Sequence, residues 1–420
     1  MTTEDGKKNI VIIGGGIIGC TSAYYLTRHP SFDPSKHSIT LLEASSIAGG
    51  ASGKAGGLLG LWAYPTSIVP LSYRLHKELA DEHGGADRWG YRAVHVAQVD
   101  CIGKKPEKKT SNGINTTTTT TKDEDISLQK RSKEALGKLR AAGVPKELDW
   151  VDADSLRFYD EMGTPATTAQ VHPFQFTTAM AELARAAGVD IRTHAPVDKI
   201  NYSADGKRVE SVSYTDKSPE SSSHNEQTTL PTTDVVLAAG PWTKRLLPSA
   251  PIEALRDHSV TIRPSRPVSA YCLFTEIKLP GNGTKRSETV TPEIYARPNN
   301  EVYACGEGDR LVPLPLLSSE VAVDGAKCDE IAAHVGAVSR ELRDGEITAR
   351  QACYLPNVAS GGSSGPLIGL TGTKGLVLAA GHTCWGIQNG PATGKLVSEF
   401  VFEGGASSAK VGGLDPRLCL

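Results

Sequence analysis

The sequence predicts an α/β fold in which a Rossmann-like nucleotide-binding domain is interleaved with an α+β domain built on a mostly antiparallel sheet. Apolar runs followed by glycine turns and helical patterns occur near both ends of the 420-residue chain. Between about residues 251 and 310, short strand-like runs alternate with Pro and Gly, which is typical of antiparallel strands. A chain of this length exceeds one ordinary core, so we expect two domains or one interleaved pair.

The first element is an apolar run, Ile10–Ile13, which reads as a buried parallel strand. It enters a turn in which Gly14, Gly16 and Gly19 satisfy G-x-G-x-x-G. The first glycine permits a tight turn, the second lets the backbone approach a pyrophosphate, and the third lets the following helix pack closely. The N-terminal N–H groups of that helix favour phosphate. The segment therefore predicts a dinucleotide site.

A second apolar run, Ile39–Leu42, ends on Glu43. This acid lies roughly 20 residues beyond the glycines, where a carboxylate can accept both ribose hydroxyls. The fingerprint alone does not choose between FAD and NAD.

Three later features favour a flavin. Residues 47–59 are rich in glycine, alanine and serine, so their backbone can lie against a flat ring or a second phosphate. Residues 234–242 form another apolar strand with a glycine turn. Residues 375–394 read as strand, glycine turn and helix start, whose free N–H groups could stabilise negative charge on a reduced flavin ring.

In this order, these features resemble the D-amino-acid-oxidase superfamily of FAD-dependent oxidoreductases, which includes glycine and sarcosine oxidases, and a fungal branch named only as oxidoreductases. The resemblance covers nearly the whole chain apart from two polar insertions. It implies a glutathione-reductase-type FAD-binding domain. It also implies an enzyme that oxidises a C–N bond of an amine or amino-acid-like substrate by hydride transfer to flavin N5, with O2 as acceptor and H2O2 as product.

The resemblance also assigns parts of the site. The segment matching 51–58 lies along the pyrophosphate and flavin, the residue matching Val197 packs by the adenine, and the segment matching 381–387 bonds the pyrimidine end of the ring. The full set of expected cofactor-binding residues is Gly14, Gly15, Gly16, Ile17, Ile18, Gly19, Glu43, Ala44, Ser45, Ala51, Ser52, Gly53, Lys54, Ala55, Gly56, Gly57, Leu58, Val197, Ala239, Gly240, Trp242, Cys353, Gly381, His382, Trp385, Gly386 and Ile387.

Lys54 is the one candidate catalytic residue, because it matches a basic position near the flavin of sarcosine oxidases, where a cation can stabilise superoxide. A solvated lysine at a loop edge is the alternative. Cys353 falls where sarcosine and fructosyl-amine oxidases attach their flavin through a thioether. We expect a buried unmodified cysteine there, with covalent attachment as the alternative.

The chain departs from the resemblance where those enzymes hold the substrate carboxylate. Glycine oxidases carry arginines, and sarcosine oxidases an arginine and a lysine, at positions that here correspond to Leu355, Cys384, Leu61 and Gln388. A buried carboxylate needs a cationic partner, so an α-amino acid anchored in the family way is not expected. The candidate substitutes are Arg266, Arg297 and Arg350, although we expect Arg297 to brace strands. Trp62, Tyr64, Trp242 and Trp385 could wall an aromatic substrate cavity.

Composition narrows the partners. The net charge of −2 gives no argument for binding nucleic acid or an anionic membrane. No long apolar run suggests a signal peptide or membrane span, so we expect a cytoplasmic protein without membrane insertion. Eight scattered cysteines without a C-x-x-C pair are read as reduced thiols, and no spacing suggests a metal. The expected partners are a small-molecule substrate and O2, and the oligomeric state is left open.

The expected organisation places the FAD-binding domain at 1–90, 169–250 and 346–420, and the substrate domain at 91–168 and 251–345. A lysine- and threonine-rich stretch at 103–125 is predicted to be a disordered insertion. Helices are expected at Thr177–Ala187 and Ala326–Leu342. A long hairpin loop, 216–233, is expected between strands Val209–Tyr214 and Asp234–Ala238.

Two other functions remain open at this point. A dehydrogenase would pass its electrons to an acceptor other than O2. A non-catalytic protein would hold FAD only as a structural ligand while binding a partner.

Overall fold

The structure is a computed structural model that describes residues 6–104, 143–219, 225–281, 286–359 and 365–420. The predicted insertion at 103–125 falls outside these residues except for its first two positions. The helices are α1 (Ile17–Leu26), α2 (Val69–His83), α3 (Gly85–Trp89), α5 (Pro173–Ala186), α6 (Thr243–Leu246), α7 (Gly325–Gly336), α8 (Arg340–Arg343) and α9 (Gly386–Glu403).

The strands are β1 (Lys8–Ile13), β2 (His37–Leu42), β3 (Leu58–Gly60), β4 (Arg92–Ala93), β5 (His95–Ile102), β6 (Leu156–Gly163), β7 (Thr168–Gln170), β8 (Asp190–Arg192), β9 (Val197–Tyr202), β10 (Val209–Thr215), β11 (Gln227–Pro231), β12 (Asp234–Leu237), β13 (Ile252–Arg263), β14 (Tyr271–Leu279), β15 (Glu288–Val290), β16 (Glu293–Arg297), β17 (Glu301–Cys305), β18 (Glu346–Val358), β19 (Leu367–Leu370) and β20 (Leu376–Ala380).

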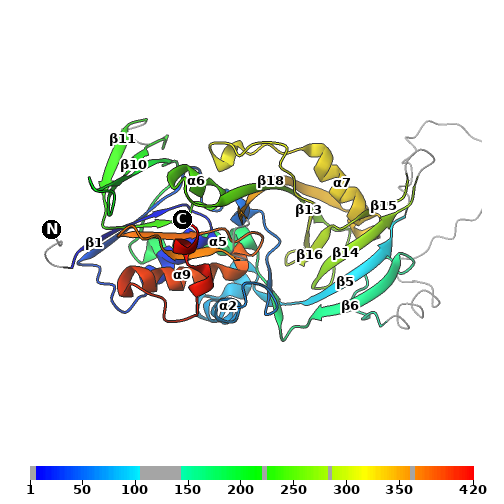
Figure 1. Ribbon diagram of the computed structural model, residues 1–420. Helices are drawn as coiled ribbons and strands as arrows, with labels where there is room; N and C mark the ends of the chain where they lie inside the picture. The colour runs from blue at the N-terminus through cyan, green and yellow to red at the C-terminus, as the bar shows by residue number, and fades with distance from the viewer. Residues whose placement is uncertain (1–5, 105–142, 220–224, 282–285, 360–364) are drawn as a thin grey trace, which may run out of the picture.

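A six-stranded sheet carries the glycine turn. Its order is β19-β20-β12-β1-β2-β8, and all neighbouring pairs are parallel except β19 with β20. Ile10 and Ile12 of β1 pack with residues of α1, α5 and α9, whereas Val11 and Ile13 pack with the three-stranded sheet β11-β10-β9. Alternate residues of a strand point to opposite faces, so this buried strand is apolar throughout. The result is three layers, with helices, parallel sheet and small antiparallel sheet stacked in turn (Figure 1).

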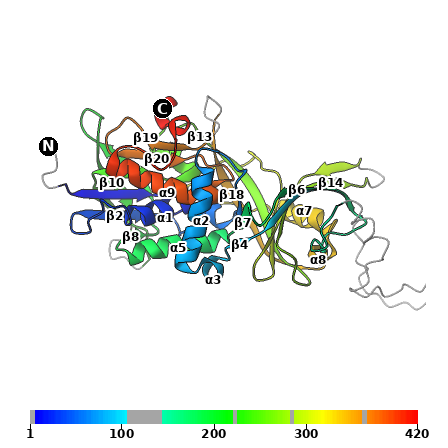
Figure 2. The same cartoon turned by 90° about the horizontal axis from the view of Figure 1, so that it is seen from below.

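A second, larger sheet lies beside this unit (Figures 1 and 2). Its order is β18-β13-β17-β16-β14-β5-β6, with β15 added to β14, and all pairs are antiparallel except β14 with β5. Helix α7 packs on it through Cys328, Ile331 and Val335. The ends of β13 and β18 at Ile252 and Val358 reach the core of the parallel sheet, so this pair of strands connects the two units. The predicted α/β fold with a mostly antiparallel second sheet is confirmed, while the predicted domain boundaries stay a prediction.

The structure corrects two element predictions. The helix expected at Ala326–Leu342 is two helices, α7 and α8, because the Ser339 side chain accepts a hydrogen bond from the Leu342 N–H and starts a new helix. Strand β10 pairs with β11 inside the polar stretch expected to be a loop, whereas β12 joins the parallel sheet. Exposed and half-buried residues alternate along β11, which suits an edge strand with one exposed face.

In the described ranges, the structure contains no helix that is both long and apolar enough to cross a membrane.

Candidate functional site

A cavity of about 490 Å³ lies between the two sheets. One side is formed by the carboxyl ends of β1, β2 and β12, which is where ligands bind on open parallel sheets. The other side is formed by residues of β13, β16, β17 and β18 from the large sheet. Below, these two sides are called the nucleotide half and the substrate half.

The structure brings most of the predicted cofactor-binding residues to this cavity, although they come from stretches of chain that are far apart in the sequence. The predicted residues that do not line it are Gly15, Gly19, Ser45, Gly53 and Gly381. These five lie behind the wall. A Cβ on Gly19 would stand 1.9 Å from the Gly14 carbonyl oxygen, and one on Gly53 would stand 2.2 Å from that of Ala48. Gly19 and Gly53 therefore permit close backbone packing.

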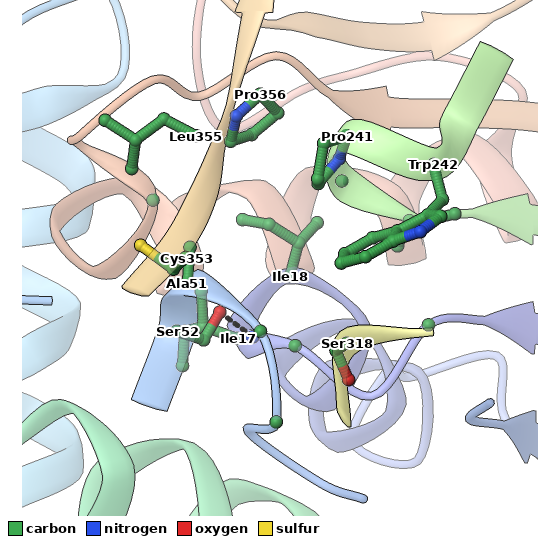
Figure 3. Close-up of a pocket in the computed structure, with 18 of the residues that line it drawn as sticks. Ile17, Ile18, Ala51, Ser52, Pro241, Trp242, Ser318, Cys353, Leu355 and Pro356 are labelled. Atoms are coloured by element: carbon green, nitrogen blue, oxygen red, sulfur yellow. Dashed lines mark hydrogen bonds between the residues drawn. The ribbon is translucent and has the colours of Figure 1, made fainter. Parts of the chain in front are cut away.

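The glycine turn is shaped by what surrounds it. Gly14 has φ +114°, and a Cβ there would stand 2.4 Å from the Ala238 carbonyl oxygen. Helix α1 begins after Gly16 without a side-chain cap, and its first turn holds no acidic residue. The Ser52 hydroxyl accepts the Ile17 N–H at 2.9 Å, which ties the small-residue segment to the start of this helix (Figure 3). The positive end of the helix dipole thus faces the cavity, with no acidic residue in the first turn of the helix itself.

Glu43 is held in place by the turn that it borders. Its two carboxylate oxygens accept the N–H groups of Gly15 at 2.7 Å and Ser45 at 2.8 Å. Burial raises the pKa of this carboxyl, while the same N–H donors oppose that rise. Gly15 and Ser45 do not line the cavity themselves, but their N–H groups orient Glu43, which does.

At the far end of the small-residue segment, Lys54 lines the cavity and is half-buried. Its Nζ donates to the Ala352 carbonyl oxygen at 2.9 Å, and burial lowers its pKa. The Lys54 ammonium group is therefore held at the cavity wall, while its catalytic role stays a prediction. Cys353, the next residue of β18, is buried and also lines the cavity (Figure 3). Burial raises the pKa of its thiol to about 12.

The C-terminal turn closes the cavity. His382 lines it and shares a hydrogen bond of 3.0 Å with Thr393, and burial lowers the pKa of the imidazole to about 3, so the ring is neutral. Gln388 does not line the cavity, and its side-chain oxygen accepts the Gly60 N–H at 2.8 Å. It links helix α9 to strand β3 rather than facing a ligand.

The substrate half contains residues that the sequence analysis missed. They are Asp257 of β13, Phe274 of β14, Glu293 and Tyr295 of β16, and Tyr303 and Cys305 of β17. Glu293 pairs with Cys305 in the sheet, and its Oε2 accepts from the Tyr295 hydroxyl and, at 3.9 Å, from the Cys305 thiol. Burial raises the pKa of Glu293. The sequence did contain a signal for Glu293, because an acid as the first residue of the strand Glu-Ile-Tyr-Ala-Arg is unusual in a buried sheet.

Asp257 is the second carboxyl of the substrate half. Burial raises its pKa to about 7, and the nearby carboxylates of Glu293 and Asp309 act in the same direction. Its Oδ1 is buried without a hydrogen-bond partner among the described residues.

None of the three candidate substitute arginines lines the cavity. Arg297 donates to the carbonyl oxygens of Ala55 and Gly56 and pairs with Glu301 at 2.9 Å, which confirms that it is a brace, here for the small-residue segment. Arg266 pairs with Glu341 and Asp149, and Arg350 pairs with Asp329.

An aromatic cluster stands at one edge of the substrate half. Trp62 packs edge-on against both Trp385 and Phe274, with ring centroids 5.6 and 6.0 Å apart, and Tyr64 contacts Trp385. Trp385 and Phe274 line the cavity, whereas Trp62 and Tyr64 are exposed. Trp242 does not join this cluster, because its ring lies beside Gly50 and its Nε1 donates to the Pro315 carbonyl oxygen at 2.8 Å (Figure 3).

Comparisons with known proteins agree with this architecture. The family model DAO, described as FAD dependent oxidoreductase, matches residues 9–400. The chain is 36% identical to the oxidoreductase TDA3 of Saccharomyces cerevisiae, across 99% of this chain and 95% of that protein. It is 35% identical to the oxidoreductase C1F5.03c of Schizosaccharomyces pombe, across 98% of each.

Solved structures share the fold at low sequence identity. A glycine oxidase from Bacillus cereus superimposes with a TM-score of 0.65 and 18% identity, covering 95% of each chain. An L-proline dehydrogenase from P. horikoshii gives 0.64 and 17%, covering 98% of this chain and 97% of its own. With a matching model over nearly its whole length and two relatives above 30% identity, the chain belongs to the DAO family of FAD-dependent oxidoreductases.

Proposed function

We propose that this FAD-dependent oxidoreductase oxidises the C–N bond of an amine or amino-acid-like substrate to an imine, which then hydrolyses in solution. When bound, FAD would supply the redox chemistry: it would accept the hydride that the substrate carbon loses while the nitrogen loses a proton, and two electrons would then pass with two protons to O2 to give H2O2.

The nucleotide half fits FAD. A helix start beside glycines, whose N-cap residue Gly16 has no side chain, suits a diphosphate, because its backbone N–H groups and dipole favour anions. Glu43 lines the cavity at the end of β2, in reach of a ribose. We therefore assign the predicted residues that line the cavity to FAD contacts and Gly15, Gly19, Ser45, Gly53 and Gly381 to supporting the wall.

The observation that carries the proposal is the continuity of the cavity. The same space is lined by the glycine turn on one side and by ionisable and aromatic side chains of the large sheet on the other. A substrate held by the large sheet can then meet a ring held by the parallel sheet. Proteins of this fold named as glycine oxidase, iminodiacetate oxidase and L-amino acid deaminase favour a C–N substrate class.

We assign Lys54 the role of stabilising the negative charge that develops on O2. Its ammonium group is held at the cavity wall by the Ala352 carbonyl oxygen and does not form an ion pair with any residue that the structure describes. A fixed, partly desolvated cation of this kind stabilises an anion more strongly than a solvated one.

A dehydrogenase that uses another electron acceptor is the second candidate. It is favoured by the similarity of fold to an L-proline dehydrogenase.

The test is anaerobic mixing of the yellow protein with primary amines, secondary amines, α-amino acids and glycated amines, followed by aerobic mixing. We expect at least one class to bleach the flavin, and one H2O2 to form per flavin when oxygen is admitted. Bleaching followed by slow reoxidation without peroxide would favour the dehydrogenase. If no class bleaches the flavin, the proposed reaction is wrong.

A further inference from the structure

We propose that the substrate is an amine without a carboxylate on the reacting carbon, and that Glu293 recognises its cationic nitrogen. This inference rests on the proposed C–N oxidation and narrows its substrate class.

Two acidic side chains line the substrate half of the cavity. Asp257 and Glu293 both line the cavity, from strands β13 and β16 that flank β17 on either side. The cationic side chains that line the cavity, within the described ranges, are Lys54, Lys217 and Arg245. Lys217 follows β10, which belongs to the small sheet, and Arg245 lies on α6 and donates to the carbonyl oxygens of residues 314–316. Only Lys54 therefore offers a cation near the two acids.

Neither acid forms an ion pair with a residue that the structure describes. The partners of Glu293 are the Tyr295 hydroxyl and the Cys305 thiol, both neutral donors. Asp257 leaves one buried oxygen without any partner among the described residues. A buried acid without a cation is costly, so a ligand that brings a positive charge would be stabilised where one that brings a negative charge would not.

Leu355 and Cys384 both line the cavity, and neither carries a charge that could bind a carboxylate. Glu293 is near enough to Cys384 to raise the pKa of that thiol. A substrate carboxylate in this part of the cavity would thus face two acids and two neutral side chains, with Lys54 as the one lining cation on this side among the described residues. An ammonium group would face two acceptors.

The aromatic cluster favours an apolar group as the remainder of the substrate. Phe274 and Trp385 present ring surface to the same cavity, next to the exposed Trp62 and Tyr64. Aromatic walls bind apolar groups and also attract cations over their faces.

The test compares amines with the amino acids that differ from them only by the carboxylate. Suitable pairs are propylamine with 2-aminobutyrate, 2-phenylethylamine with phenylalanine, and N-methylbenzylamine with N-methylphenylglycine. The readout is the second-order rate constant for anaerobic flavin reduction in the unmodified protein. We expect the amine to exceed its amino acid roughly tenfold or more in each reactive pair, which corresponds to one lost or gained charged hydrogen bond.

Faster reduction by the amino acids would overturn this inference and leave the proposed C–N oxidation intact. If neither the paired compounds nor any other class of amine bleaches the flavin, both this inference and the proposed C–N oxidation are wrong.

A variant then tests Glu293 itself. Glu293→Gln keeps the size of the side chain and an oxygen acceptor but removes the charge. We expect KM for the amine to rise roughly tenfold to hundredfold, with a smaller change in kcat, and the preference within each pair to shrink. The matched control is Glu276→Gln on the exposed face of β14, outside the cavity. This substitution should change neither KM for the amine nor the preference within each pair. An unchanged preference in Glu293→Gln that still binds FAD would contradict the assignment.

Discussion

The two halves of the cavity are built in different ways. The nucleotide half is made of short contiguous segments, in which glycines let backbone approach backbone, as at Gly14 beside Ala238 and Gly57 beside Val171. The substrate half is made of single side chains, such as Asp257, Glu293 and Tyr303, contributed by separate strands of the large sheet. The first kind of wall depends on the absence of side chains, and the second depends on their chemistry. Changes in the two halves should therefore affect different steps.

The largest effect is expected from Gly14→Ala. The new Cβ would stand 2.4 Å from the Ala238 carbonyl oxygen, at a φ of +114° that side chains rarely adopt, so the turn must move. We expect FAD affinity to fall roughly a hundredfold or more, measured by reconstitution of the apoprotein. Gly405→Ala is the control, because a Cβ there meets nothing within 4 Å. Normal FAD binding by Gly14→Ala would show that the turn does not form the nucleotide half.

The next effect is on stability and concerns the large sheet. Asp309 pairs with Arg256 of β13 at 3.1 Å, and the two side chains are only 10% and 5% exposed. Asp309→Asn leaves this arginine buried without its counter-ion, so we expect the free energy of unfolding to fall by about 2 kcal/mol in urea. Asp329→Asn, which breaks the exposed pair with Arg350, should cost less than about 1 kcal/mol.

FAD affinity of the folded Asp309→Asn protein should remain normal. A parallel loss of FAD binding would mean that the two halves are not independent.

A pH effect is expected from Asp257. Its pKa is raised to about 7 by burial, above the unfolded value of about 3.9. The folded state therefore binds the proton more tightly, and the free energy of unfolding of the apoprotein should decrease as the pH rises from about 4 to about 7. Asp257→Asn removes this contribution, so its stability should fall less than that of the unmodified apoprotein between pH 4 and pH 7. Identical pH dependence in urea unfolding would show that Asp257 titrates normally.

The smallest effect is expected from Cys353→Ser. The thiol is buried and its pKa is raised, so we expect no bond to the flavin and no change in FAD content. Acid precipitation of the unmodified protein should release all yellow colour into the supernatant. Colour that stays in the pellet of the unmodified protein, but not in that of Cys353→Ser, would establish a thioether.

Most residues that the sequence singles out for the nucleotide half line one cavity, and they could be found because the information for them is local. Glycine spacing, the apolar strand before it and the acid after the next strand are all set by neighbours in the chain. The fold class followed from the same segments. The substrate half could not be read in this way, because Glu293 and Cys305 become neighbours only through strand pairing.

Arginines were expected to hold a substrate carboxylate, whereas the large sheet lines the cavity with the acids Asp257 and Glu293. Arg266 and Arg350 are paired with acids away from the cavity, and Arg297 supports the backbone of the small-residue segment. An arginine's partners depend on the packed sheet, which sequence spacing does not describe. The hairpin prediction failed for a related reason, since the polar residues of β11 pair with β10 on an edge.

The most direct test of this division is an FAD titration of the Glu293→Gln apoprotein, followed by fluorescence quenching, beside the unmodified apoprotein. If the halves are separate, the two dissociation constants should agree within about twofold, even though oxidation of the amine is impaired. A loss of FAD affinity in proportion to the loss of amine oxidation would contradict the account, because Glu293 would then support the cofactor rather than the substrate.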